Sequence, residues 1–228
     1  MCFELDSDPP IARIAGAAVS HDDLVLEAAD GNSFAAFEAT PDEPNGIGVV
    51  ILPDVRGLYR FYEELALRFA ERGYLAIAID WFGRTAGVGK RGEEFEYPEH
   101  TAQTTQQGIQ ADIAAAVEHL RPRARAIVTV GFYGMPGDRG DGLPGPIDRA
   151  AEMEAPILAL QAGADQHITA KLNDAFDRAL TDAGVEHEVV TYDGAPHSFF
   201  DRRQEDYAEA SDDAWRRVLD FLGRHRLD

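Results

Sequence analysis

Cysteine and lysine are nearly missing from this sequence. The single cysteine, Cys2, excludes a disulfide bridge within the chain and fits a protein of the reducing cytoplasm. Lysine occurs only at Lys90 and Lys171, so arginine supplies most of the basic charge. A salt-adapted host and a GC-rich genome, which exchanges lysine codons for arginine codons, would both produce this usage, and the sequence does not separate them.

Basic charge as a whole is scarce. The 21 Lys and Arg residues face 41 Asp and Glu residues, which gives a net charge of −20. This charge disfavours nucleic acids and anionic membrane surfaces as partners, because both are polyanions. No apolar run approaches the roughly 20 residues that span a bilayer. The acidic N-terminus, residues 1–6, differs from the basic start of a secretory signal. We therefore expect a cytoplasmic protein.

Apolar runs alternate with amphipathic stretches along the chain, which predicts an α/β fold. The 228 residues fit one domain, 1–228, with a substantial core. We expect a mostly parallel central sheet with helices on both faces, preceded by a β-hairpin around Asp30-Gly31-Asn32. The predicted core strands are 47–53, 74–80, 126–132, 156–161 and 187–192, the hairpin strands 23–29 and 33–39, the helices 61–72, 104–120, 170–183 and 206–224, and an exposed polar loop 85–102.

An acid and a base follow two of these strands in the second half of the chain. Asp165 comes after the apolar run 156–160, and His197 comes after the strand-like run 188–192. Acid then histidine is the order of an α/β-hydrolase triad, in which the histidine is the general base and the aspartate orients it. The alternatives are a turn-forming aspartate and a histidine without a role. His167 creates an Asp-x-His pair, but two ligands without a third do not predict a metal site.

No nucleophile accompanies this acid and base. The strand 126–132 leads into Tyr133, where a strand-to-helix elbow would present Ser or Cys. Residues 133–146 are rich in Gly and Pro, so no helix follows. None of the serines lies in an elbow, and Ser198 is the sequence neighbour of His197, so the two side chains diverge. Cys2 lies in an unpatterned terminus, which favours a bystander thiol.

Several segments taken together resemble the dienelactone hydrolase family of the α/β-hydrolase superfamily. The resemblance runs from about Phe34 to Leu222 and rests on the strand and turn 49–58, the Gly-Tyr…Asp-x-x-Gly-Arg segment 73–84, Asp165, and the turn 196–199. The family has a G-x-C-x-G elbow, its helix, and one further strand that ends in a Gly-Phe-Tyr-Gly-like turn. In this chain the first strand runs directly into that later turn. The fold is therefore predicted to be shortened by about one strand–helix crossover.

The resemblance also implies roles for residues in the first half of the chain. Asp54 matches the acidic residue beside the nucleophile, and the backbone N–H of Val55 matches one donor of the oxyanion hole. Arg84 and, about one position off, Arg202 match arginines that bind a substrate carboxylate. A helix N-cap is the alternative for Asp54, and surface ion pairs are the alternative for the arginines.

The function implied by the resemblance is hydrolysis of a small ester or lactone, without a cofactor or metal, through thiolate attack and an acyl-enzyme. Because the nucleophile is missing, we expect little or no hydrolysis by this covalent route. Two alternatives stay open. The chain is a non-catalytic relative that binds a small molecule, or it is the product of an accidental or engineered deletion in an active hydrolase. The sequence does not predict the oligomeric state.

Overall fold

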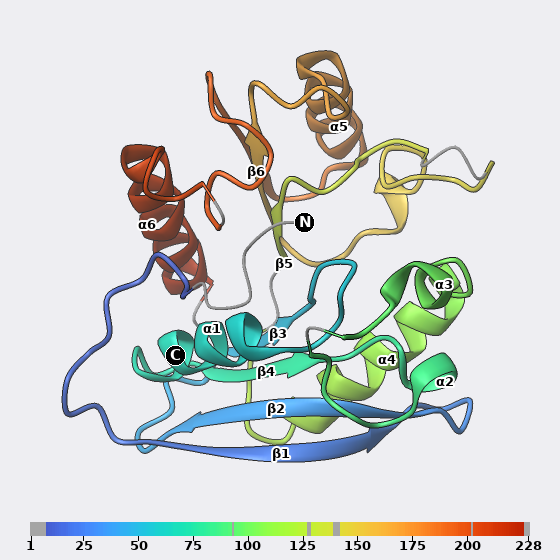
Figure 1. Cartoon of the computed structure of the whole chain (residues 1–228). Helices are drawn as coiled ribbons and strands as arrows, with labels where there is room; N and C mark the ends of the chain where they lie inside the picture. The colour runs from blue at the N-terminus through green and yellow to red at the C-terminus, as the bar shows by residue number, and fades with distance from the viewer. Residues whose placement is uncertain (1–7, 93, 127–128, 139–141, 202, 226–228) are drawn as a thin grey trace. The chain divides into compact units, whose positions relative to one another are not determined.

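The computed structural model describes residues 8–92, 94–126, 129–138, 142–201 and 203–225. Within these residues the chain forms two compact units, 8–126 and 129–225, and each is described by itself. Figure 1 labels the elements along the chain. The expectation that 1–228 is a single domain stays a prediction.

The first unit contains a four-stranded mixed sheet in the order β1-β2-β4-β3. The predicted hairpin is confirmed, because β1 and β2 pair antiparallel around the turn at Asp30-Gly31-Asn32. β4 then pairs antiparallel with β2 and parallel with β3. The elements of this unit are β1 (Val19–Glu27), β2 (Ser33–Pro41), β3 (Gly48–Ile51), α1 (Arg60–Ala70), β4 (Leu75–Ile79), α2 (Gly83–Ala86), α3 (Tyr97–Thr101) and α4 (Gln106–Leu120).

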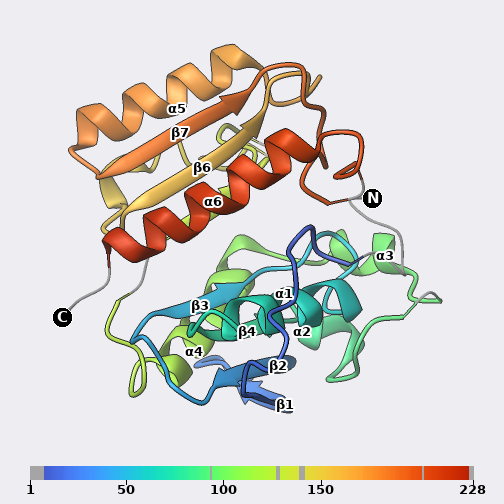
Figure 2. The ribbon, with the colours of Figure 1, turned by 90° about the vertical axis from the view of Figure 1, so that its left-hand side faces the viewer.

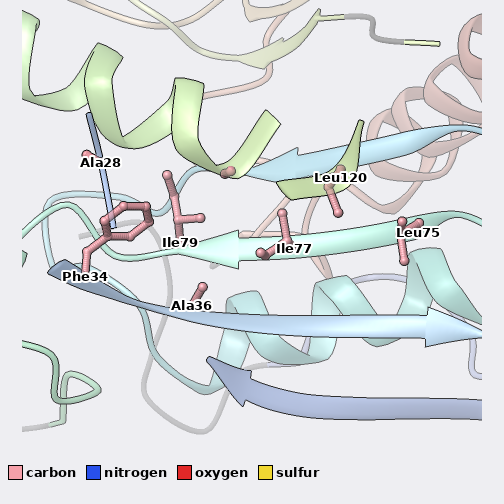
Figure 3. Packing of buried hydrophobic residues seen from close by; sticks show 8 residues of the cluster. Ala28, Phe34, Ala36, Leu75, Ile77, Ile79 and Leu120 are labelled. Atoms are coloured by element: carbon pink, nitrogen blue, oxygen red, sulfur yellow. The ribbon is translucent and has the colours of Figure 1, made fainter. Parts of the chain in front are cut away.

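One core cluster of the first unit lies between its sheet and α4. Side chains alternate between the two faces of a strand, so Leu75, Ile77 and Ile79 of β4 share one face. They pack against Ala116 and Leu120, which lie one turn apart on α4. Figure 3 shows Leu120 beside the side chains of β4. Phe34, Ala28 and Ala36 complete this cluster from the hairpin. The predicted buried strand at 74–80 is therefore confirmed.

The second unit contains a three-stranded parallel sheet in the order β5-β6-β7. Figure 2 shows α5 and α6 on opposite sides of this sheet. Both helices match their predicted ranges within two residues. The elements are β5 (Thr129–Phe132), the 3₁₀ helix η1 (Ala150–Glu152), β6 (Ile157–Ala162), α5 (Ala170–Ala183), β7 (His187–Tyr192) and α6 (Ala208–Arg224).

The predicted α/β fold is confirmed, and all five predicted core strands occur. They form two hydrogen-bonded sheets among the described residues, where the sequence predicted one central sheet. The predicted strand 126–132 is divided. Ala126 forms an isolated parallel bridge with Ile47 in the first unit, 127–128 lie outside the described residues, and 129–132 form β5 in the second unit.

Two details of the prediction are wrong. β5 is not fully buried, because it is an edge strand of its sheet and pairs, among the described residues, with β6 alone. The loop 85–102 is not exposed throughout, because Arg91 is 7% exposed and its guanidinium pairs with the fully buried Asp80. As predicted, 133–138 and 142–146 form no helix. No helix among the described residues is long and apolar enough to cross a membrane.

Candidate active site

Two turns meet at the carboxyl ends of β6 and β7 in the second unit. The two strands are parallel neighbours, so the segments that follow them leave the sheet at the same edge. Backbone hydrogen bonds join the turns, from Gly163 N to Tyr192 O at 2.9 Å and from Ala164 N to Ala195 O at 2.9 Å. A Cβ atom on Gly163 would lie 2.7 Å from Tyr192 O. Glycine therefore permits the close approach that places the residues after it beside the second turn.

Asp165 and His197 are brought together by these turns, as the sequence predicts. Asp165 Oδ2 lies 2.6 Å from His197 Nδ1. The other carboxylate oxygen accepts hydrogen bonds from the backbone N–H groups of His167, at 2.8 Å, and Ile168, at 3.1 Å. The Asp165 side chain is 2% exposed, whereas the His197 side chain is 48% exposed. The carboxylate is thus fixed and buried, and the imidazole reaches into solvent.

The environment of Asp165 favours its ionised form. Burial by itself raises the pKa of the carboxyl, but the hydrogen bonds from His167, His197 and Ile168 outweigh it and hold the pKa below the ordinary value of 3.8. An ionised carboxylate only accepts hydrogen bonds, so the proton on the imidazole resides on Nδ1. In the neutral imidazole this tautomer leaves the lone pair of Nε2 to act as a base.

No nucleophile faces this base within the part of the chain that the structure describes. None of the described serine hydroxyls hydrogen-bonds to His197. Ser198 is 3% exposed, and its backbone has a φ of +68°, in the left-handed region. Ser211 is engaged elsewhere, since its hydroxyl donates to Phe199 O at 2.9 Å. Cys2 and Ser7 lie outside the described residues.

Tyr133, at the position of the expected elbow residue, holds the histidine turn. Its backbone has a φ of +40°, which is uncommon for a bulky residue. The phenol donates to Asp201 Oδ2 at 3.2 Å and accepts from Phe200 N at 3.1 Å. Its ring lies 4.9 Å from the His197 ring, centroid to centroid. The sequence marks Tyr133 only as the residue in place of the elbow Ser or Cys. It does not predict this supporting role, because the contacts join residues nearly 70 positions apart.

Asp54 and Val55 lie in the turn that follows β3 in the first unit. Asp54 accepts hydrogen bonds from the backbone N–H of Arg56, at 2.9 Å, and from its guanidinium, at 3.2 Å. The helix N-cap alternative for Asp54 is wrong, because α1 begins after Tyr59 and its cap makes no side-chain hydrogen bond. Among the described residues the Val55 N–H has no hydrogen-bond acceptor. It is thus available as the donor that the family resemblance implies.

A buried carboxylate that the sequence did not single out supports the same turn. Asp80 accepts hydrogen bonds from Leu58 N at 3.0 Å, from Phe82 N at 2.9 Å and from Arg91 Nη2 at 2.8 Å. Gly57 has a φ of +81°, and a Cβ atom there would lie 2.5 Å from Asp80 Oδ1. The turn after β3 is therefore packed directly onto the end of β4.

Arg84 is held by two carboxylates of the first unit. Its guanidinium donates to Asp112 at 2.5 Å and to Asp30 at 2.7 Å, and Asn32 donates to the other Asp112 oxygen at 2.9 Å. Burial lowers the pKa of Arg84, but the two carboxylates outweigh it and raise the pKa. The geometry is that of the ion-pair alternative, and a role in substrate binding stays a prediction. Arg202 lies outside the described residues.

No group of three or more His, Cys, Asp or Glu side chains that could hold a metal ion occurs in the described ranges. His167 contributes its backbone N–H, not its imidazole, to the Asp165 turn.

The chain is similar to known proteins of one family over most of its length. The sequence profile of the dienelactone hydrolase family matches residues 34–132 and 121–226. A "Putative carboxymethylenebutenolidase" of Saccharolobus solfataricus is 27% identical over 252 residues, covering 86% of this chain and 95% of that protein. A "Probable 2-oxo-3-(5-oxofuran-2-ylidene)propanoate lactonase" of Bradyrhizobium sp is 25% identical over 228 residues, covering 86% of this chain and 91% of that protein.

Solved structures share the fold. A "Putative Dienelactone Hydrolase" from Klebsiella pneumoniae is similar at a TM-score of 0.75, with 23% identity over 90% of this chain and 99% of that chain. The acylaminoacyl peptidase of Pyrococcus horikoshii is similar at a TM-score of 0.69, with 13% identity over 91% of this chain and 42% of that chain.

The comparisons also bear on the missing segment. Residues 121–132 fall in both matches to the family profile. The alignment with the Saccharolobus protein spans 252 positions while covering 86% of a 228-residue chain, so that relative has residues without a counterpart here. The doubly matched stretch includes Ala126, which bridges to Ile47, and β5, which pairs with β6.

Proposed function

Because the chain belongs to the dienelactone hydrolase family, we propose that it hydrolyses a small carboxylic ester or lactone slowly, with water as the nucleophile. The observation that supports this proposal is the Asp165–His197 pair, joined at 2.6 Å and open to solvent on the imidazole side. The acid and base of the family mechanism are retained, and the side chain that would be acylated is not found among the described residues.

The chemistry follows from the state of the pair. His197 Nε2 removes a proton from a water molecule as the water oxygen attacks the carbonyl carbon. Asp165 stabilises the imidazolium that forms and keeps the ring in place. The tetrahedral intermediate then breaks its bond to the leaving alcohol oxygen, which takes the proton back from Nε2. The products are a carboxylic acid and an alcohol, and a lactone gives both in one molecule. No covalent intermediate with the protein forms.

The substrate class is supported by the names of relatives. The Bradyrhizobium protein is named as a lactonase of an oxofuranylidene propanoate, which favours a lactone. Arg84 and Arg202 stay predictions for recognising a substrate carboxylate, and Asp54 and the Val55 N–H stay predictions for the neighbourhood of the reacting carbonyl. A general base of this kind contributes about 10²–10⁴-fold. We therefore expect a rate well below that of an enzyme with an acylated nucleophile.

The double match at 121–132 supports the view that the nucleophile segment is missing from this chain. A strand–helix crossover in a parallel sheet needs a dozen or more residues. If the crossover between two strands with similar sequences were lost, the first half of one strand would continue directly into the second half of the next strand. It would remove the elbow and its helix together, while leaving the acid and the base in place.

The test is steady-state hydrolysis of 4-nitrophenyl acetate and of dihydrocoumarin by the wild type and His197→Ala. We expect the rate above background to fall by roughly a hundredfold in His197→Ala. His21→Ala is the matched control, because it removes another exposed imidazole and should leave the rate unchanged. Cys2→Ser should also leave the rate unchanged. Equal rates for the wild type and His197→Ala would contradict the proposal.

A further inference from the structure

A hollow of about 390 Å³ lies on the α5 face of the second sheet. It is lined by β5 and β6, by the loop after β5, by Met153 near η1 and by Phe176 of α5. Neither Asp165 nor His197 is among the lining residues, so this is a different place from the candidate active site. Its volume falls within the roughly 300–1,000 Å³ of small-molecule sites.

The strand register shows why the space is open. Gly131 of β5 pairs with Ala159 of β6, so both residues face the same side of the sheet. Ala159 packs in the cluster with Phe176, which identifies this side as the α5 face. A Cβ atom built on Gly131 or on Gly134 would meet no atom within 4 Å. Gly131 and Gly134 thus leave this side of the sheet without a side chain at two positions, while Thr129 contributes the side chain of β5 to the lining.

A buried polar group stands in the wall of this hollow. Gln161 is 2% exposed, and its Nε2 donates to Gly134 O at 3.1 Å. Its Oε1 is buried and has no hydrogen-bond donor among the described residues. Buried side-chain acceptors nearly always have a partner, so an unpaired one calls for a donor from outside the described chain. The rest of the lining is mainly apolar, with Glu154 exposed at its edge.

We propose that the hollow binds a neutral apolar molecule that carries one hydroxyl or N–H group, which donates to Gln161 Oε1. The apolar walls favour an aromatic or aliphatic body of small size. The exposed carboxylate of Glu154 and the net charge of −20 disfavour an anion. A small aromatic alcohol satisfies all of these features at once.

A matched pair of probes tests both parts of the proposal, 2-naphthol and 2-methoxynaphthalene. They share the ring system, and only the first has a donor. Titration calorimetry with the full-length His197→Ala protein keeps hydrolysis out of the measurement. We expect one saturable site per chain for 2-naphthol and weaker binding of 2-methoxynaphthalene.

Two substitutions connect the binding to the hollow. Gly131→Val fills the open space from a strand position that suits a β-branched residue, and should weaken both probes at least about tenfold. Gln161→Leu removes the acceptor and should weaken 2-naphthol roughly tenfold while leaving 2-methoxynaphthalene unchanged. If Gly131→Val fails to fold by circular dichroism, Gly131→Ala replaces it and should weaken both probes by a smaller factor.

Several results would overturn the proposal. One is the absence of saturable binding. Another is full affinity in the folded Gly131 variant, which would locate the probes elsewhere. Equal affinity of both probes for the wild type would show that the hydroxyl of 2-naphthol does not donate to Gln161 Oε1, and that a water molecule is the donor there. A further result is that neither probe binds, the wild type self-associates, and Gly131→Val abolishes the self-association. A second copy of the chain would then occupy the hollow.

Discussion

At the scale of single residues, Asp165 has well-defined surroundings. Its buried carboxylate accepts hydrogen bonds from two backbone N–H groups and contacts His197, and its pKa lies below 3.8. A pKa lowered by folding stabilises the native state above the unfolded value, and the benefit is lost as the pH falls through the native value. We predict that Asp165→Asn lowers the free energy of unfolding by about 2 kcal/mol at pH 7.

The difference between wild type and Asp165→Asn should shrink below a pH of about 3.8, because protonation then removes the advantage of the wild-type carboxylate. Urea unfolding at pH 7 and at pH 3 measures this difference. A gap of the same size at both pH values would show that the charge of Asp165 contributes nothing to stability.

Tyr133 provides a second prediction at this scale. Tyr133→Phe keeps the ring against His197 but removes the hydroxyl, which leaves Phe200 N and Asp201 without that partner. We predict a loss of about 1–3 kcal/mol in the free energy of unfolding, measured by urea denaturation. Tyr97→Phe is a suitable control, since Tyr97 lies in the short helix α3 of the other unit. An unchanged free energy in Tyr133→Phe would refute the supporting role.

The site could be predicted from the sequence only where its residues follow strands. Asp165 and His197 each come directly after an apolar run, so the topology of a parallel sheet brings them to one edge. Tyr133 and Asp80 contribute through contacts with residues distant along the chain, and no local pattern marks such contacts. The alternative role of Asp54 as a helix N-cap does not occur, because α1 begins farther along the chain, at Arg60, and Asp54 pairs with Arg56 instead.

At the scale of elements, continuous apolar runs predicted β4 and β6 well, since both strands are buried throughout. The prediction was less accurate for β5. Its sequence, Thr129-Val130-Gly131-Phe132, has the composition of a buried strand, but burial depends on having neighbours on both sides. The number of neighbours is a property of the whole sheet, and a single strand's sequence does not encode it.

Gly163 connects two elements and carries a prediction of its own. Gly163→Ala would place a methyl group 2.7 Å from Tyr192 O and force the turns after β6 and β7 apart. We predict a loss of about 1–3 kcal/mol in stability, together with reduced ester hydrolysis. Gly223→Ala, in α6 with open space around its Cβ position, should cost nothing. Equal effects of the two substitutions, measured by urea unfolding, would contradict the packing argument.

At the scale of the whole molecule, we propose that residues 1–228 unfold as one cooperative domain. The chain has two tryptophans, Trp81 in the first unit and Trp215 in the second. Trp81→Phe and Trp215→Phe therefore each leave a fluorescent probe in a single unit. We expect the two variants to unfold at the same urea concentration, once the loss of stability caused by each substitution itself is taken into account. Separated midpoints would show two independently folding domains.

The central claim is that the acid and base act on water and that no side chain is acylated. The most direct measurement combines rapid mixing of the protein with an excess of 4-nitrophenyl acetate and intact mass analysis of the quenched protein. We predict release of nitrophenol without a burst, and a mass that stays at that of the unmodified 25.0 kDa chain. A burst approaching one equivalent per chain, with an acetyl group retained on one residue that depends on His197, would contradict it.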